Sequence, residues 1–205
     1  MIDRKFVVHW IAGLFAALAA TPAAGQTLND QEQLTLANGK AVVRVAPDDR
    51  GADGQIYGVI EIPAAPSKVW RVLVDCEHAP KIMANLRSCR VLERADAGDQ
   101  GKRSWDVREH QIAWVSVLPT VRSVFRSEYV RESSIRFAKA DGGDLTALDG
   151  EWRLESTQGG AGTRLLYRAR FGFLAVVPSF LVRQSMANDF PGFLETIRAE
   201  AINLR

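Results

Sequence analysis

The chain has 205 residues and a formal net charge of +2, with 26 basic and 24 acidic side chains. This length is typical of one globular domain with a core large enough to fold independently. The 47% hydrophobic and 24% charged content is ordinary for such a domain. Because the basic residues are balanced by acidic ones and form no basic run, the composition argues against a nucleic-acid-binding protein.

The first 25 residues have the pattern of a secretory signal peptide. A positive start at residues 4–5 precedes an apolar stretch at 6–20, and small residues at 23–25 come just before Gln26. The alternative is an uncleaved anchor, but about 15 apolar residues fall short of the roughly 20 that a membrane span needs. We therefore expect residues 1–25 to be removed and the mature protein to reach an oxidising compartment, such as a bacterial periplasm.

The chain contains two cysteines, Cys76 and Cys89. In an exported protein they are expected to form a disulfide, which stabilises the fold by about 3 kcal/mol in the chain-entropy view of a short loop. The alternative is two free, buried thiols. Since His78 and His110 have no metal-type spacing with the cysteines, the sequence predicts no metal site.

The remaining chain divides into an N-terminal segment at 26–53 and a domain at 54–205. The segment is polar and predicts an extended arm or an added edge strand. Alternation that ends at a proline predicts a strand at 54–62, and Pro66 opens a short helix through residue 74, before a second short helix at 76–84. From residue 88 the period changes to two, which predicts antiparallel strands joined by short turns. These strands are expected at 88–94, 103–118, 121–130, 133–140, 145–155 and 163–174.

Alternation also assigns faces to the later strands. Arginine and glutamate positions share one face, and the opposite, inward face is largely aromatic. The strand at 103–118 is ambiguous: either its even positions, with Arg108 and His110, or its odd positions, with Glu109, point inward. The aromatic inward residues of the other strands are Phe125, Tyr129, Trp152, Tyr167, Phe171 and Phe173.

The C-terminal stretch, residues 178–205, predicts a long helix that covers this aromatic face. Pro178 suits a first helical turn, and apolar residues recur at helical spacing. Pro191 lies inside and predicts a kink or break near 187–190. A strand, two short helices, about six to seven antiparallel strands and a long helix make an α+β architecture.

Several short stretches resemble START-like (SRPBCC) proteins, a group that includes the polyketide cyclase/dehydrase family and the coenzyme Q-binding family. The first three are APSKVW at 65–70, DCEHAPK at 75–81 and SCRVLE at 88–93. IRF at 135–137, LDGEW at 148–152 and GTRL at 162–165 follow in the same order. The resemblance covers about 54–200 and implies a helix-grip fold: a curved antiparallel sheet wrapped around the long C-terminal helix, with a hydrophobic cavity between them. The secretory signal departs from the pattern and argues against a cytoplasmic or mitochondrial quinone role.

No catalytic motif stands out. The chain has no phosphate-binding glycine loop after a strand, no nucleophile elbow and no carboxylate pair of diagnostic spacing, so no cofactor is predicted. The weak acid–base candidates are Arg108, Glu109 and His110. A lone histidine among charged residues is more often structural than catalytic.

The aromatic set points instead to a binding protein. Its alternative reading is an ordinary filled core, but an apolar cavity with few polar groups suits a lipid-like ligand. The first hypothesis is binding or transport of a lipid, quinone or isoprenoid-like molecule, with transient contact to a membrane surface. The second is a polyketide cyclase/dehydratase-like enzyme; the third is a partner-binding protein with a filled core, and the oligomeric state stays open. The predicted ligand-binding residues are Trp114, Phe125, Tyr129, Trp152, Tyr167, Phe171, Phe173, Phe180, Met186 and Phe190.

Overall fold

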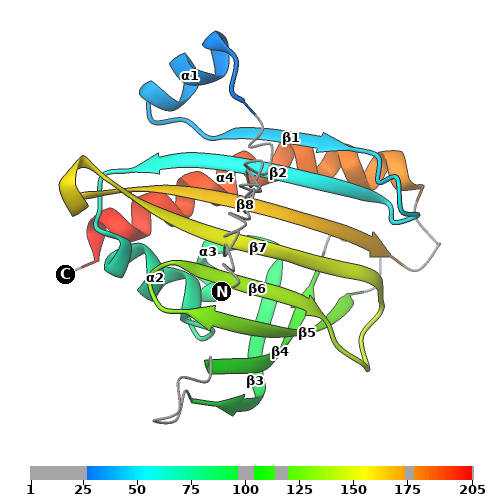
Figure 1. Cartoon of the computed structure of the whole chain (residues 1–205). Coiled ribbons are helices and arrows are strands. Elements are labelled where there is room, and N and C mark those ends of the chain that lie inside the picture. Colours follow the sequence, from blue (N-terminus) through cyan, green and yellow to red (C-terminus); the bar gives the residue numbers. More distant parts are fainter. Residues whose placement is uncertain (1–26, 97–103, 114–119, 174–177, 205) are drawn as a thin grey trace, which may run out of the picture.

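The structure is a computed structural model, and it describes residues 27–96, 104–113, 120–173 and 178–204. These residues form one curved antiparallel sheet of eight strands and four α-helices (Figure 1). The strands are β1 (Val42–Ala46), β2 (Gly54–Ile62), β3 (Leu86–Ala95), β4 (Ser104–Ile112), β5 (Val121–Val130), β6 (Ser134–Lys139), β7 (Leu145–Thr157) and β8 (Gly162–Phe173). The helices are α1 (Asp30–Ala37), α2 (Pro66–Val74), α3 (Ala79–Ile82) and α4 (Ser179–Asn203).

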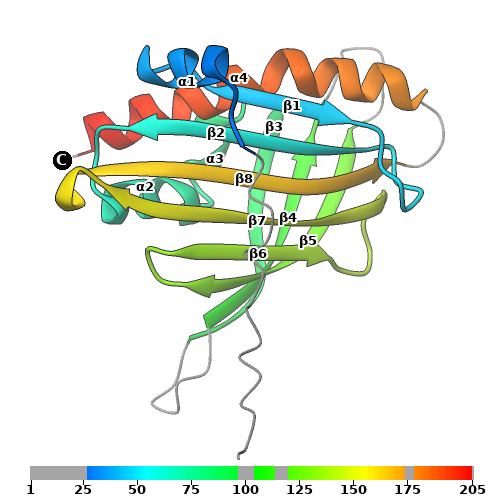
Figure 2. The same ribbon diagram turned by 45° about the horizontal axis from the view of Figure 1, so that its top comes forward.

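The sheet has the order β1-β2-β8-β7-β6-β5-β4-β3. Except for β2 and β3, which the two short helices separate, strands that follow each other in the chain pair with each other, and the pairing of β2 with β8 joins the two ends of the domain. The sheet curls so that β3, β4 and β5 turn away from β1 and β2 (Figure 2). We call the side that carries α4 the inner face and the opposite side the outer face.

Helix α4 packs against the inner face of β1 and β2, with α2 and α3 beside it. The helix comes very close to the sheet over Gly58, where an added Cβ would lie 3.0 Å from Leu194 Cδ1 and 3.1 Å from Phe190 Cε1. The contact buries Ile60, Leu165 and Leu194 completely, and each such side chain contributes about 1.5–3 kcal/mol relative to exposure. Glycine in β2 therefore lets the helix lie directly on the sheet.

Polar contacts hold α4 at both ends. At its start, the Asp53 carboxylate accepts hydrogen bonds from the Phe173 backbone N–H and the Ser179 hydroxyl, so it links β8 to the first turn of the helix. At its end, the Lys68 ammonium of α2 donates to the Leu204 carbonyl oxygen at 2.6 Å. The contact at the end satisfies a carbonyl group that a helix terminus leaves without an intrahelical partner, and the contact at the start ties the helix to the sheet.

A second, smaller apolar cluster lies on the outer face, where α1 covers β1 and β2. Its buried members are Leu36, Val42, Tyr57 and Val59. Helix α1 begins with a capping box, because the Asn29 side chain accepts from the Glu32 N–H and the Glu32 carboxylate accepts from the Asn29 N–H. The N-terminal segment thus adds a helix and an edge strand to the sheet.

The expected α+β helix-grip architecture is confirmed, including the strand at 54–62 and the two short helices after it. The sheet has eight strands rather than six to seven, because β1 adds an edge strand. Of the kink or break predicted near 187–190, the break is wrong, since α4 runs continuously from Ser179 to Asn203 with Pro191 inside it. The strand predicted at 103–118 ends as β4 at Ile112, and α1 was not predicted.

Candidate functional site

A ladder of aromatic side chains crosses the inner face from β4 to α4. Ring centroids lie 4.8 Å apart for His110 and Phe125, and 6.2 Å apart for Phe125 and Phe137. The ladder continues through Tyr167, whose ring is 5.9 Å from Phe137 and 4.8 Å from Phe190 of α4. Because these residues come from five different elements, the ladder exists only in the folded sheet–helix arrangement. We call these five residues the aromatic ladder.

Several inward-facing apolar side chains keep part of their surface accessible. Trp152 packs against the ladder, with its ring 4.2 Å from that of Tyr167. The partly buried apolar residues that contact the main core include Phe125, Trp152, Tyr167, Phe173, Met186 and Phe193. Helix α4 packs against β1, β2 and α2, and its Phe190 and Phe193 rings contact Trp152, so these partly exposed side chains line the inner face where the sheet meets the helix. An apolar concave wall with few polar groups is the kind of surface that holds a lipid-like molecule.

A buried polar cluster lies on the inner face beyond the ladder. Arg108 Nε donates to Asp106 at 2.9 Å, and Arg108 also donates to the Val74 carbonyl oxygen at 2.8 Å, which ties β4 to the end of α2. The Tyr129 hydroxyl donates to the other Asp106 oxygen at 2.7 Å. Burial, helped by this hydrogen bond, raises the pKa of Tyr129 far above its usual range, so the phenol stays protonated. The cluster satisfies its own charges, and its first role is to hold α2 against the sheet.

His110 is the ladder residue with a nitrogen-containing ring, and it differs from this cluster. Its Nε2 is buried and has no hydrogen-bond partner among the described residues. Burial, together with the positive charge of Arg108, lowers the pKa of His110 to about 4. The imidazole is therefore neutral at pH 7 and offers one donor and one acceptor nitrogen.

The structure decides which face of β4 points inward. Arg108 and His110 lie on the inner face, whereas Glu109 lies on the outer face between Arg122 and Arg90. The hydrogen bond from Arg122 is the main reason that the pKa of Glu109 is lowered. The three weak catalytic candidates are therefore split between the two sides of the sheet, and Glu109 is held in an outer ion-pair network.

The other predicted ligand-binding residues divide into three groups. Phe171 and Phe173 lie on the inner face with ring centroids 6.3 Å apart, and Met186 packs against the same core. Phe180 lies at the start of α4 with 59% of its surface exposed, so the structure does not bring it into the aromatic ladder. Trp114 lies outside the residues that the structure describes.

Cys76 and Cys89 form the predicted disulfide, with their Cα atoms 5.4 Å apart. The bond joins the connection after α2 to β3, where Cys89 pairs directly with His110 of β4. It therefore fastens the α2–α3 segment to the strand next to the ladder.

Sequence reasoning missed two residues that contribute to the inner face. Phe137 is the third ring of the ladder, and Trp70 of α2 lies edge-on to Tyr129 with ring centroids 6.0 Å apart. The alternation of Ile135, Arg136 and Phe137 carried the signal for Phe137. The place of Trp70 on the inner face could not be predicted without knowing how α2 packs on the sheet.

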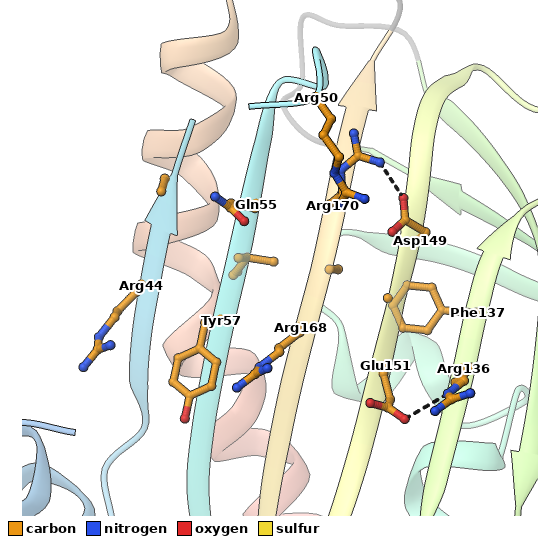
Figure 3. Close-up of a pocket in the computed structure, with 14 residues that line it drawn as sticks. Arg44, Arg50, Gln55, Tyr57, Arg136, Phe137, Asp149, Glu151, Arg168 and Arg170 are labelled. Atoms are coloured by element: carbon orange, nitrogen blue, oxygen red, sulfur yellow. Dashed lines mark hydrogen bonds and ion pairs between the residues drawn. The ribbon is translucent and has the colours of Figure 1, made fainter. Parts of the chain in front are cut away.

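A separate hollow of about 580 Å³ lies on the outer face and is lined by β1, β2 and β6–β8 (Figure 3). Its charged groups are largely paired with each other: Arg170 contacts Asp149 at 3.0 Å, and Arg136 contacts Glu151 at 3.1 Å. Self-neutralised guanidinium and carboxylate groups offer little to an oily molecule. We therefore take the inner face as the candidate site.

Among the described residues, no group of three or more histidine, cysteine, aspartate or glutamate side chains is arranged to hold a metal ion. In the same part of the chain, no helix has the length and apolarity to cross a membrane.

Comparison with protein families decides the relationship that the fold suggests. Residues 62–198 match the family described as polyketide cyclase / dehydrase and lipid transport. The chain belongs to this family. A comparison with curated proteins found no match.

Solved structures of the same fold include lipid-transfer proteins and an aromatase/cyclase. The STAR-related lipid transfer protein from Xanthomonas axonopodis is 17% identical, with a TM-score of 0.65 over 80% of this chain and 94% of that one. Human STARD10 is 15% identical, with a TM-score of 0.65 over 87% of this chain and 82% of that one. The Zhui aromatase/cyclase from Streptomyces sp. R1128 is 15% identical, with a TM-score of 0.58 over 78% of this chain and 94% of that one. At these identities the likeness establishes the fold.

Proposed function

We propose that the protein binds a hydrophobic small molecule, of the lipid, quinone or isoprenoid kind, against the inner face of its sheet and serves as its carrier. The observation that supports this is the set of partly exposed aromatic rings on the inner face, where the sheet meets α4. Membership of a family described by lipid transport points the same way.

Apolar burial alone supplies enough free energy for such a role. Each 100 Å² of apolar surface removed from water contributes about 2.5 kcal/mol. A long-chain or polycyclic molecule that lies along the rings needs no directed chemistry to be held, and few polar groups are needed to orient it.

The test starts with the protein purified from its native compartment and extracted with organic solvent for mass spectrometry. A co-purifying apolar molecule is expected. The protein is then stripped and titrated with decylubiquinone, a probe whose binding is followed by native mass spectrometry. Failure to extract or load any apolar molecule would refute the carrier function.

A matched pair of variants localises the site. Trp152 lies on the inner face beside Tyr167, whereas Trp105 lies on the outer face under the Arg126 guanidinium, 3.7 Å from its ring centroid. Trp152→Ala is expected to weaken probe binding by about tenfold, because it removes tens of Å² of apolar contact. Trp105→Ala is expected to leave binding unchanged. Equal effects of the two substitutions would contradict an inner-face site.

The proposal includes export and removal of residues 1–25. The Cys76–Cys89 disulfide supports it, because disulfides persist in oxidising compartments. Intact mass measurement of the protein recovered from a bacterial periplasm is expected to give a chain that begins at Gln26 and lacks two hydrogens. A chain that retains its first 25 residues would contradict cleavage.

Loading from a membrane is part of the same proposal, since such ligands dissolve poorly in water. Phe180 and Leu181 at the start of α4 are 59% and 45% exposed, which suits contact with a lipid surface. Phe180→Asp is expected to slow ligand transfer from liposomes without a change in the affinity for dissolved ligand. An unchanged transfer rate would remove Phe180 from the membrane-contact surface.

The second candidate function is a polyketide cyclase/dehydratase-like enzyme. The observation that favours it is the neutral His110 imidazole on the inner face, whose Nε2 has no partner in the described part of the chain, since a positioned imidazole can transfer protons. Turnover of a poly-β-ketone substrate that is lost in a folded His110→Gln variant would favour the enzyme. Binding of such a substrate without turnover would favour the carrier.

A further inference from the structure

Histidine 110 occupies the middle of β4, at the end of the aromatic ladder. Its cross-strand neighbours are Ser123 of β5 and Cys89 of β3. On the same face the ring of Phe125 meets the imidazole edge-on at 4.8 Å. Since Ser123 has a small side chain, the strand beside the imidazole is not filled by a bulky group at this position.

The Nε2 atom of His110 is an exception among the polar groups of the inner face. Asp106, Arg108 and Tyr129 satisfy one another, and the buried Thr163 hydroxyl donates to the Ala64 carbonyl oxygen at 2.7 Å. Within the described residues, the other buried side-chain atom without a partner is Arg198 Nε. That guanidinium packs beside Gly39 in the turn after α1, away from the ladder.

A buried polar atom without a partner destabilises the folded protein, because its hydrogen bond to water is lost and not replaced. Native proteins rarely keep such an atom unless a bound group or a function explains it. Here the orphaned nitrogen lies on the face that we propose holds an apolar ligand. The ligand itself is the partner that would satisfy it.

The surroundings of His110 define what that partner is. The imidazole is neutral at pH 7, so it favours a neutral group over an ion. The nearest cation, Arg108, already donates to Asp106 and to the Val74 carbonyl oxygen, so it is not free to neutralise an anionic head group. A hydroxyl group both donates and accepts, and therefore pairs with either tautomer of the ring.

We propose that His110 Nε2 forms a hydrogen bond with the hydroxyl group of an otherwise apolar ligand, whose hydrocarbon part lies along the aromatic ladder. The ligand class is therefore an apolar alcohol or phenol. This inference depends on the proposed carrier function and adds to it the polar group that selects the ligand and fixes its orientation.

The test compares three probes with the same hydrocarbon skeleton: farnesol, its methyl ether and farnesene. Dissociation constants are measured by native mass spectrometry for the full-length mature protein. Wild type is expected to bind farnesol about three- to tenfold more tightly than farnesene, which is the usual net value of one hydrogen bond. The methyl ether, which accepts but cannot donate, is expected to lie between them.

Two variants assign the preference to His110. His110→Phe keeps a ring in the ladder but has no nitrogen, and is expected to bind all three probes alike, with farnesene at the wild-type level. His110→Asn restores a donor and an acceptor and is expected to recover part of the preference. An unchanged farnesol preference in His110→Phe would overturn the assignment.

The melting temperature without ligand gives an independent readout. Because His110→Phe removes an unsatisfied polar atom, its melting temperature is expected to equal or exceed that of wild type. A marked fall would mean that the imidazole already has a partner in the empty protein, which would overturn the inference. If His110→Phe does not fold, the inference is tested by the preference of wild type among the three probes and by the part of that preference that His110→Asn keeps.

The failure modes differ. Equal binding of farnesol and farnesene by wild type would overturn the hydroxyl preference and leave the carrier function standing. Failure of all three probes and of decylubiquinone to bind would overturn the carrier function and this inference with it.

Discussion

At the residue scale, His110 couples the stability of the fold to pH. Its pKa is about 4 in the folded protein and about 6.5 in an unfolded chain. Between these values the unfolded state takes up a proton that the folded state excludes, so stability falls as pH decreases from about 6.5 to about 4. The loss amounts to roughly 3 kcal/mol, because each pKa unit corresponds to about 1.4 kcal/mol.

Urea unfolding between pH 7.5 and 4.5 checks this prediction, with His110→Gln as the comparison. The variant has no titrating ring at this site and is expected to lose most of the slope. The charged and titratable groups near His110 are Arg108, Asp106 and Tyr129. They are present in both proteins, as is His78, so they do not contribute to the difference between the two slopes. Carboxylates with lowered pKa values, such as Glu109, change stability only at lower pH, where they become protonated. An identical slope in the two proteins would show that His110 is not the cause.

The direction of individual side chains could be predicted from the sequence in some strands but not in β4. The inward positions of β5, β7 and β8 were predicted correctly, because charged and apolar residues alternate there. In β4 this signal is lost: Asp106 and Arg108 are buried on the inner face, and Glu109 is buried on the outer face. Each charge is satisfied by a partner from another strand or from the same face, and such pairing is not visible in the sequence.

At the scale of elements, the seating of α4 on β2 depends on Gly58. Gly58→Ala would bring a methyl group to 3.0 Å from Leu194 Cδ1, and Leu194 is completely buried and has little room to move. We expect a loss of about 1–3 kcal/mol, the usual range for overpacking. Gly192→Ala is the matched control, since a Cβ there meets nothing within 4 Å.

Gly192 lies inside α4, where alanine is the better helix former, so Gly192→Ala is expected to stabilise the protein by about 0.5–1 kcal/mol. Urea unfolding of both variants measures the two effects. The same chemical change is thus expected to act with opposite sign at the tight contact between β2 and α4 and at an exposed position of α4. A stabilising Gly58→Ala would contradict the close seating of the helix.

The disulfide also joins separate elements, because it links the segment after α2 to β3. It closes a loop with a sequence separation of 13 residues, and its reduction is expected to cost about 3 kcal/mol of stability. Unfolding with and without reductant measures the loss. The Cys76→Ala/Cys89→Ala double variant is the control, and its unfolding free energy is expected to be the same with and without reductant. A wild type equally insensitive to reductant would contradict the prediction.

Two elements differ from what the sequence led us to expect. Helix α1 has a single buried residue, Leu36, so periodicity could not reveal it, although the Asn29–Glu32 capping box was a usable signal. Helix α4 continues through Pro191 because contacts along its length and at both ends hold it in place. Tertiary packing outweighs the local cost of a proline in this position.

At the scale of the whole molecule, the order of elements was enough to predict the helix-grip fold, because hairpins joined by short turns leave few alternatives. The contents of the inner face were less predictable. The ladder joins rings from β4, β5, β6, β8 and α4, and such contacts depend on the curl of the sheet. Which part of the inner face α4 packs on likewise follows from tertiary packing rather than from the sequence pattern.

The position of α4 relative to the sheet depends on Asp53, which joins the start of β2, the end of β8 and the first turn of the helix. Its carboxylate accepts from the Phe173 N–H at 2.7 Å and from the Ser179 hydroxyl. Asp53→Ala leaves in place the hydrogen bond that the Arg183 guanidinium donates to the backbone carbonyl oxygen of residue 53. It removes both carboxylate bonds, so we expect a loss of about 1–3 kcal/mol.

Hydrogen exchange by mass spectrometry separates this local effect from general destabilisation. Amides in the first two turns of α4 are expected to exchange faster in Asp53→Ala, whereas those near Leu204, held by Lys68 at 2.6 Å, keep their wild-type rates. Ser185→Ala is the control, because it removes only an exposed bond to Asp189 within the same helix. Uniformly faster exchange along α4 would mean that the helix has no separate attachment at its start, and unchanged exchange would mean that Asp53 does not hold it.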